Sequence, residues 1–205
     1  NLLSMVSGES SRSSPGHDPN RQRAAVSSRF GRAFVLALAI LACGMPVAAH
    51  GYVIDGKRWP GRTITYYAAA KPYRSEVDRA ANAWNQARVG VTFVRAPKAK
   101  AEVVVHYSEA PCDGFALVGY QGPAHQSSAR LGRGCDKDLI VVIAVHELGH
   151  VLGLGHEKHK CARMNAVVDF DGTPGRCAHH PLSYWVKHPL RSDDVRGARF
   201  LYGSD

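Results

Sequence analysis

The chain has 205 residues, of which 45% are hydrophobic and 21% charged, a globular balance that excludes wholesale disorder, collagen and coiled coil. Its formal net charge of +9 comes from basic residues scattered along the chain, so we expect no nucleic-acid partner. No segment repeats at a fixed period, which argues against a solenoid or a propeller. The length allows one ordinary domain and a tail. Eleven histidines are the first compositional sign of site chemistry.

Residues 1–49 have the pattern of an N-terminal extension that ends in a secretory signal peptide. A segment rich in Ser and Arg, 1–32, precedes an apolar run at 33–43, and small residues follow at 47–49. A basic flank, a short apolar core and small residues before the cut are the parts of such a signal. The run is shorter than the ~20 residues that a membrane-spanning helix needs. We expect cleavage after Ala49, secretion of residues 50–205 as one catalytic domain, and no stable membrane insertion afterwards. An uncleaved anchor is the alternative.

The expected elements of 50–205 follow from periodicity and from turn residues. A strand is expected over 63–67, and then a helix that begins at a capping-box pattern over 75–78 and ends at Gly90. Short strands are expected over 91–94 and 102–107. The glycine-rich stretch 108–137 is expected to be a loop with one edge strand near 116–120. A helix over 139–154, an irregular stretch over 155–190 and a last helix from 192 to 203 complete the prediction.

The exported part of the chain keeps an even number of cysteines. Cys43 leaves with the signal peptide and four cysteines remain, which indicates two disulfides in an oxidising compartment. Three pairings are possible. We favour the sequential one, because each bridge then closes one irregular loop that contains glycine: Cys112–Cys135 and Cys161–Cys177. The alternative is a zinc site that combines Cys161 and Cys177 with His179 or His180.

The segment from His146 to His156 carries the chemistry, with the sequence His-Glu-Leu-Gly-His-Val-Leu-Gly-Leu-Gly-His. On a helix, His146 and His150 lie one turn apart on the same face, where two imidazoles can bind one zinc ion. Gly153 lets the chain leave the helix in a backbone conformation that other residues resist, which can bring His156 back as a third ligand. Three protein ligands leave one position for water, as in catalytic rather than structural zinc sites.

Glu147 is the expected catalytic residue. It follows the first histidine, where its carboxylate can reach a water molecule that the zinc ion activates. As a general base it would take a proton from this water and return it to the leaving amine. The alternative is an apolar buried helix whose histidines are ordinary core groups. Three imidazoles and a carboxylate would, however, be costly to bury without a partner.

This motif resembles the extended zinc motif of the metzincin metallopeptidases, and it is most similar to that of the matrixins, the matrix metalloproteinase-like members. The resemblance implies an α/β fold of the α+β kind. That fold has a small twisted mixed sheet with two helices, an active-site helix, a Met-turn, an irregular lower subdomain and a C-terminal helix. It also implies that Met164 forms the Met-turn beneath the zinc site and that the acidic pair Asp193 and Asp194 braces this turn. Capping of the last helix is an equal alternative for the pair.

The chain departs from the matrixin pattern in three places. Residues 1–49 contain no cysteine-switch segment. The stretch 108–137 contains Cys112 and Cys135 but no match to the Asp- and Gly-rich loop that holds structural zinc and calcium in animal matrixins, so a calcium requirement is left open. Glu157 follows the third histidine, where astacins have Glu and matrixins commonly have Ser. The subfamily is therefore not fixed by the motif.

Together these observations predict a secreted, monomeric endopeptidase that holds one catalytic Zn²⁺ and cleaves protein or peptide substrates. The substrate would lie extended along an exposed strand edge, with the residues around 165–168 walling the pocket just past the scissile bond. A peptidase confined to short peptides is one alternative. The other is an exported, zinc-stabilised binding module without proteolytic activity, which the presence of Glu147 disfavours.

Overall fold

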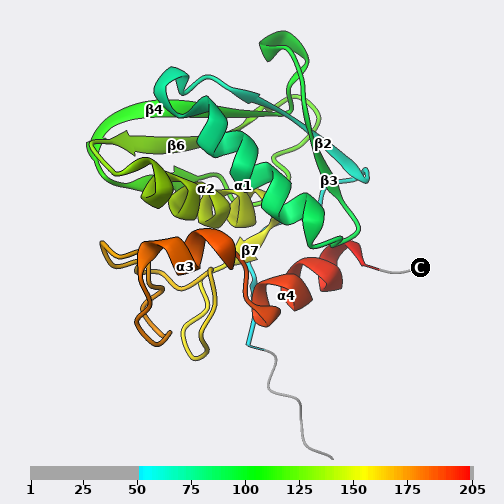
Figure 1. The fold of residues 1–205 in the computed structure, drawn as a ribbon. Helices are drawn as coiled ribbons and strands as arrows, with labels where there is room; N and C mark the ends of the chain where they lie inside the picture. The colour runs from blue at the N-terminus through cyan, green and yellow to red at the C-terminus, as the bar shows by residue number, and fades with distance from the viewer. Residues whose placement is uncertain (1–50, 204–205) are drawn as a thin grey trace, which may run out of the picture. The chain divides into compact units, whose positions relative to one another are not determined.

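Five strands form a mixed β-sheet in the computed structural model, which describes residues 51–203 (Figure 1). In spatial order the strands are β3 (Thr92–Arg95), β2 (Thr63–Ala68), β4 (Val103–Pro111), β6 (Ser127–Arg133) and β5 (Gly114–Ala116). The first four run parallel, whereas β5 is antiparallel to β6 and forms one edge of the sheet. The N-terminal extension with its expected signal peptide lies outside the described residues.

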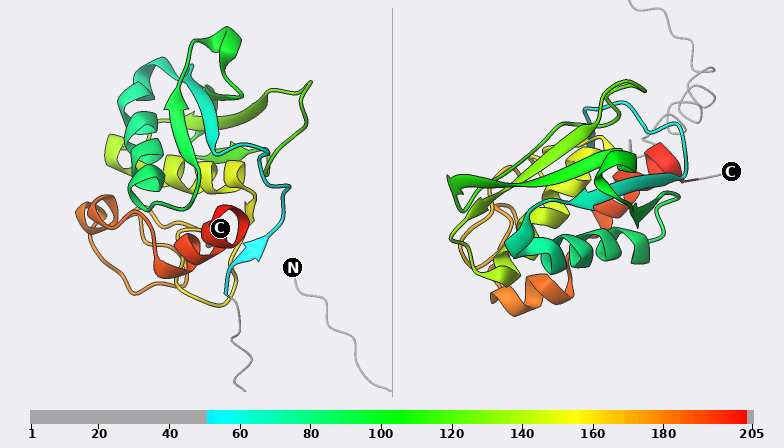
Figure 2. Two further views of the ribbon diagram at one scale, coloured as in Figure 1. Left: turned by 90° about the vertical axis from the view of Figure 1, so that its right-hand side faces the viewer. Right: turned by 90° about the horizontal axis from the view of Figure 1, so that it is seen from above.

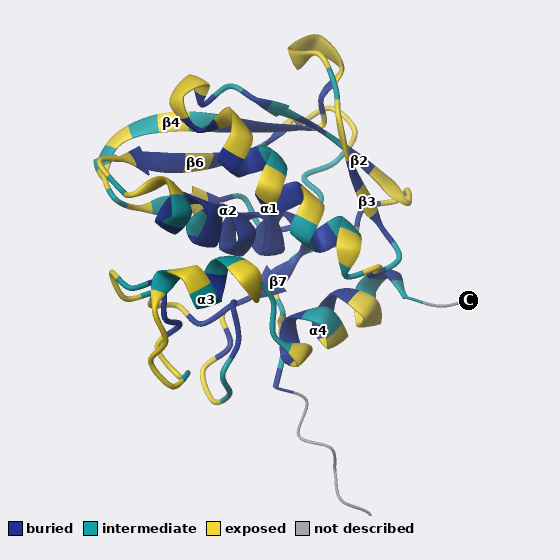
Figure 3. Ribbon diagram, viewed as in Figure 1, coloured by how far each residue is buried: buried dark blue, intermediate teal, exposed yellow. Residues whose placement is uncertain are grey.

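Two helices, α1 (Arg74–Gln86) and α2 (Lys137–Leu152), pack on one face of the sheet (Figure 2). The apolar residues Val77, Ala80, Ala81 and Trp84 of α1 are buried, and Trp84 Nε1 donates to the carbonyl of Val145 in α2 at 2.9 Å. α2 is buried on nearly every side, because the sheet covers one flank and the lower part of the chain covers the other (Figure 3). This surrounding explains why α2 is apolar around its circumference instead of showing a single stripe.

The chain below α2 is mostly irregular. Its regular elements are the short antiparallel pair β1 (Val53–Ile54) and β7 (Leu154–Gly155), and the helices α3 (Leu182–Lys187) and α4 (Ser192–Tyr202). A second apolar cluster lies between α2 and α3, around Leu139, Val142 and Trp185, and the cysteines of both disulfides pack against it. The lower part is therefore attached to α2 by apolar contacts and covalent bridges rather than by a sheet.

Both disulfides favoured from the sequence are present, Cys112–Cys135 and Cys161–Cys177. The first joins the turn between β4 and β5 to the segment that precedes α2. The second closes a loop of the lower part. Because Cys161 and Cys177 are bonded to each other, the alternative zinc site that combines this pair with His179 or His180 is excluded.

The mixed sheet, its two helices, the irregular lower part and the C-terminal helix confirm the predicted α/β fold class. The expected strands over 63–67, 91–94 and 102–107 correspond to β2, β3 and β4, with ends that differ by up to a few residues. Within residues 51–203, no helix has both the length and the apolar character needed to cross a membrane.

The expectation that 108–137 is a loop is wrong. β4 extends to Pro111, the edge strand β5 lies at 114–116 rather than 116–120, and the whole of β6 follows. β6 escapes prediction because the side chains that it buries in alternation, Ser127, Ala129 and Leu131, include only one large hydrophobe. The short helix α3, within the expected irregular stretch 155–190, is likewise not predicted.

Two helices also begin differently from the prediction. α1 begins at Arg74, directly after the 3-10 turn η1 (Lys71–Tyr73), so Ser75 lies inside the helix and its hydroxyl donates to Glu76 at 2.9 Å instead of capping. α2 begins at Lys137, two residues early, because the Asp136 carboxylate accepts from the backbone N–H of Asp138 at 2.8 Å. A second 3-10 turn, η2 (Lys98–Lys100), precedes β4.

Each disulfide should contribute substantially to stability. Replacing both cysteines of one bridge by serine should lower the free energy of unfolding by about 2–4 kcal/mol, because the bridge restricts the unfolded chain. Urea unfolding of Cys161→Ser/Cys177→Ser and of Cys112→Ser/Cys135→Ser, each against the parent, measures this loss. Peptide mapping of the parent without reductant serves as the control for the pairing. An unchanged unfolding midpoint in both double variants would contradict the prediction.

Candidate metal centre and cleft

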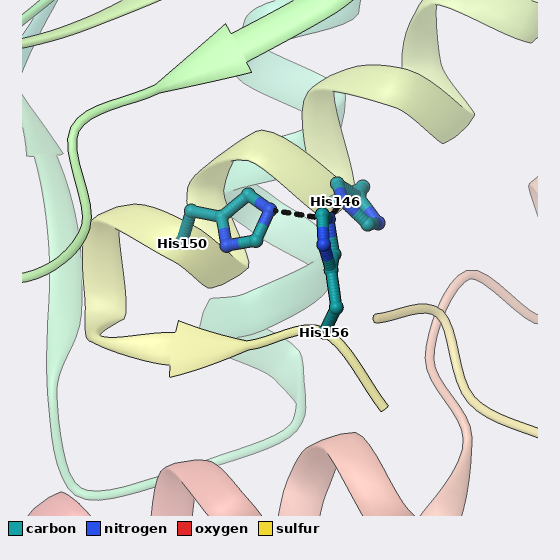
Figure 4. Close-up of side chains that lie close together, drawn as sticks. All are labelled: His146, His150 and His156. Carbon is teal, nitrogen blue, oxygen red and sulfur yellow. Dashed lines mark hydrogen bonds between the residues drawn. The ribbon is translucent and has the colours of Figure 1, made fainter. Parts of the chain in front are cut away.

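Three histidine rings converge at the C-terminal end of α2 (Figure 4). The helix places His146 and His150 one turn apart, and it ends at Gly153, whose φ of 102° lies in the left-handed region that favours glycine. The chain then pairs as β7 with β1, which returns His156 to the open side of the helix. The Nε2 atom of His156 lies 3.3 Å from that of His146 and 3.1 Å from that of His150.

Backbone carbonyls fix the orientation of the two helical rings. Nδ1 of His146 lies 2.8 Å from the carbonyl oxygen of Arg163, and Nδ1 of His150 lies 2.8 Å from that of Leu154. A carbonyl can only accept, so in both rings Nδ1 carries the proton and donates it. This tautomer leaves the Nε2 lone pairs directed into the centre, which is the form in which imidazole binds a metal.

Burial keeps the histidines neutral. Removal from water lowers the pKa of His146 to about 3, and repulsion from His150 adds to the effect. Burial also lowers the pKa of His150 and of the more exposed His156. The three rings are therefore uncharged at neutral pH without any bound ion, so a metal does not have to compete with protons for them.

The donor set fits a zinc ion. Imidazole nitrogens bound at 2.0–2.1 Å around a tetrahedral ion are about 3.3 Å apart, and the Nε2 atom of His156 lies 3.3 and 3.1 Å from the other two. Three nitrogen ligands, joined by no fourth ligand from residues 51–203, match the open coordination of catalytic zinc sites. Among the described residues, a second group of possible ligands, Asp169, Asp171 and His179, lies in the lower loop and is more exposed.

Glu147 lies beside this centre. Its side chain is only 5% exposed, and its Oε2 atom has no hydrogen-bond partner among the described residues. Burial raises the pKa of Glu147 to about 8, and the negative charge of Asp113 contributes in the same direction. A Cβ on Gly114 of β5 would overlap Oε1 of Glu147 and Cγ2 of Ile143. The edge strand can thus approach the carboxylate closely because residue 114 is glycine.

Met164 lies under the same helix. Its side chain is 3% exposed, and a Cβ on Gly149 of α2 would overlap its Sδ atom. The turn that carries it is held by Asp194, whose carboxylate accepts from the backbone N–H groups of Met164 at 3.1 Å and of Arg163 at 2.8 Å. Its neighbour Asp193 points elsewhere and accepts from Arg196 at 2.8 Å. Of the acidic pair, Asp194 is the member that contacts this turn.

Arg163 is a site residue whose role the sequence pattern does not reveal. Its carbonyl orients His146, and its side chain is fully buried over the ring of Trp185. The guanidinium donates to the carbonyls of Pro189 at 2.9 Å and Gly172 at 3.2 Å. Burial lowers its pKa to about 10, so the group stays charged at neutral pH. In the sequence, the only sign of this role is its position immediately before Met164.

A cleft of about 470 Å³ opens in front of the histidines. Its back is α2, its upper wall is β5, and its lower wall is the loop 166–170. Of the predicted wall 165–168, Ala166 and Val168 line the cleft. Asn165 does not line it, because its amide donates to the carbonyls of Glu157 and Lys160, both at 2.9 Å, inside the lower loop.

Comparison with known proteins gives a family match and several relatives. The family model described as astacin, a peptidase family, matches residues 53–170, more than half of the chain. Human stromelysin-3 is 27% identical over 195 residues, which cover 78% of this chain and 37% of that protein. Human matrix metalloproteinase-20 is 28% identical over 185 residues, which cover 78% of this chain and 36% of that protein.

A third relative, human tolloid-like protein 1, is 34% identical over 113 residues, which cover 54% of this chain and 10% of that protein. The chain thus spans little more than a third of the length of the curated relatives it matches, and much less of the last one.

The buried carboxylate should make the metal-free fold less stable at higher pH. The pKa of Glu147 is about 8 in the fold against an ordinary 4.5. The stability that this difference adds is therefore fully present below pH 4.5 and is lost as the pH rises through 8. We expect metal-stripped Glu147→Gln to lose less stability than the parent between about pH 5 and about pH 8, by a few kcal/mol at most.

Urea unfolding of both proteins in the presence of a chelator, across this pH range, measures the difference. The histidines act in the opposite direction, because their depressed pKa values cost stability as the pH falls. They are identical in the two proteins, so their contribution cancels in the comparison. Parallel pH profiles for parent and variant would show that the Glu147 carboxylate is not held protonated by the fold.

Proposed function

Because this chain belongs to the astacin family of metallopeptidases, we propose that it is a secreted, zinc-dependent endopeptidase. The observation that carries the proposal is the convergence of three neutral imidazoles beside a buried carboxylate, in a cleft bounded by a strand edge. Zinc dependence is a property of the family, and the donor set described above suits this ion.

The Nε2 atoms of His146, His150 and His156 are the proposed ligands of the one catalytic zinc ion. When bound, zinc supplies Lewis-acid chemistry, by polarising the scissile carbonyl and making a water molecule nucleophilic at neutral pH. The role of the protein itself is to hold the three imidazole rings rigidly. The carbonyls of Arg163 and Leu154 set the tautomer and the direction of the rings of His146 and His150. Loss of such a hydrogen-bond partner typically lowers metal affinity 10- to 100-fold.

Glu147 is the proposed general base. Its Oε2 atom faces no partner within the described residues, so it is available to accept the proton of an attacking water. Its buried position makes protonation easy, as the raised pKa of Glu147 shows, and a nearby cation would shift that pKa back toward the ionised form. A carboxylate balanced between the two forms can take a proton in one step and deliver it to the leaving amine in the next.

The edge strand β5 is the proposed substrate platform. The carbonyl of Asp113 accepts from Gly132 at 2.7 Å and the N–H of Leu117 donates to Ser128 at 2.9 Å, so these peptide groups face β6. Because antiparallel pairing alternates, the peptide groups of Gly114 and Ala116 face away from β6, toward the cleft. An extended peptide can pair with them as an added strand. The apolar wall at Ile143 and Val168 favours an apolar side chain just past the scissile bond.

Secretion is proposed from the N-terminal pattern and from the two disulfides, which persist in oxidising compartments. If the signal peptide is cut as expected, N-terminal sequencing of the protein recovered from the culture medium should begin at or near His50. A chain with an intact N-terminal extension found only in the membrane fraction would contradict both the cleavage and the export. The same preparation, run on a sizing column, tests the expected monomer.

Substitution of Glu147 separates catalysis from zinc binding. Glu147→Gln keeps the size of the side chain but removes its basicity, so we expect one bound zinc, near-normal folding and peptidase activity reduced by at least about 10²-fold. His146→Ala, His150→Ala and His156→Ala should lose zinc as well as activity. The assay combines metal analysis with cleavage of an unbiased peptide library, with and without a chelator.

His125→Ala is the matched control, because His125 is exposed and does not line the cleft. It should keep both zinc and activity. If Glu147→Gln cleaves peptides as fast as the parent, the proton-transfer role is wrong. If the parent binds zinc but cleaves no peptide, the protein is a zinc-stabilised binding module and the endopeptidase proposal fails.

A further inference from the structure

The acidic side chains that line the cleft are opposite in sign to the net charge of the chain as a whole. The complete chain has a formal net charge of +9. Among the described side chains that line the cleft there is no Lys or Arg, whereas Asp55, Asp113 and Asp169 line it together with Glu147. The three aspartates come from three separate segments of the chain. A concave surface of one sign concentrates ligands of the opposite sign.

Two of these carboxylates lie at opposite ends of the edge strand β5. Asp113 immediately precedes Gly114, the first residue of the strand. Asp55 precedes Gly56, where an added Cβ would come within 2.8 Å of the carbonyl oxygen of Val118, just past the strand's other end. Their charges act on different parts of the centre, that of Asp113 on Glu147 and that of Asp55 on His150 and His156.

Both aspartates are available to a ligand. Each is exposed, and no ion pair among the described residues involves either of them. Asp169 is less available, because its carboxylate lies 3.9 Å from Nε2 of His179. Two cations that lie close to cleft residues do not themselves line the cleft: Arg130 lies over the ring of Phe115 at 4.6 Å, and the charge of Lys158 acts on His156.

We propose that the cleft selects cationic peptides, with Lys or Arg side chains on both sides of the cleaved bond, recognised by Asp113 at one end of β5 and Asp55 at the other. The inference rests on the proposed function, because it is the extended peptide along β5 that reaches both ends. Exposed ion pairs contribute modestly, so each matched basic side chain should raise kcat/KM by about two- to fivefold. The preference should weaken in high salt, which screens exposed charges.

The test uses the zinc-loaded parent protein and one uncharged peptide that it cleaves. Variants of this peptide carry Lys two or three positions before the cleaved bond, after it, or on both sides, and a matched set carries Glu. We expect Lys to raise and Glu to lower kcat/KM on each side. Asp113→Asn should remove the preference on one side of the bond and Asp55→Asn on the other.

The readout is the ratio of kcat/KM for the Lys peptide to that for the uncharged peptide within each protein. Any effect of Asp113→Asn on Glu147 itself is common to both peptides and cancels in this ratio. Glu109→Gln is the matched control, because Glu109 is exposed, pairs with Arg133 at 3.3 Å and does not line the cleft. It should leave the ratio unchanged.

The outcomes separate the two proposals. If the parent cleaves no peptide, the proposed function fails and this inference fails with it. If the parent cleaves the uncharged, Lys and Glu peptides equally well, the endopeptidase proposal stands and the charge preference is overturned. Loss of the preference on the same side of the bond in both aspartate variants would overturn the assignment of one carboxylate to each end.

Discussion

The close approach of three imidazole nitrogens is the constraint on which the rest of the structure depends. The Nε2 atom of His156 lies 3.3 Å from that of His146 and 3.1 Å from that of His150. Nitrogen lone pairs at this distance repel one another unless a cation or a proton lies between them. A helix alone can supply two rings one turn apart. The third ring requires the left-handed turn at Gly153 and the pairing of β7 with β1. The residues that follow α2 and the distant strand β1 therefore both help to position the third histidine.

Close packing around α2 also determines which residues must lack a side chain. α2 is enclosed by the sheet and by the lower part of the chain, and at two places a group lies so close that only a residue without a Cβ leaves room for it. Gly149 makes this room for the sulfur of Met164, and Gly114 makes it for the carboxylate of Glu147. In the first case the glycine lets the turn support the centre from below. In the second it lets a strand edge face the carboxylate across the cleft.

Features set by a local sequence pattern were predictable, whereas features set by contacts between distant segments were not. The histidine motif, the helix α1 and the two disulfides were predictable, because residue spacing, periodicity and the number of cysteines can be read from one segment or one count. β6 was not, because its small side chains carry little alternation and its place is set by pairing with β4. Arg163 was not, because a buried arginine depends on carbonyls from distant loops.

Asp194 shows why two roles that look like alternatives in the sequence can belong to one group. Its carboxylate accepts from the N–H of Arg191, at the start of α4, at 2.7 Å, and also from the N–H groups of Arg163 and Met164. Burial raises the pKa of Asp194, while these three bonds and the charge of Arg163 oppose the shift. The cost of burying the charge is offset only while the turn at 163–164 and the start of α4 both stay in place. One carboxylate therefore caps a helix and holds the turn whose carbonyl orients the first histidine.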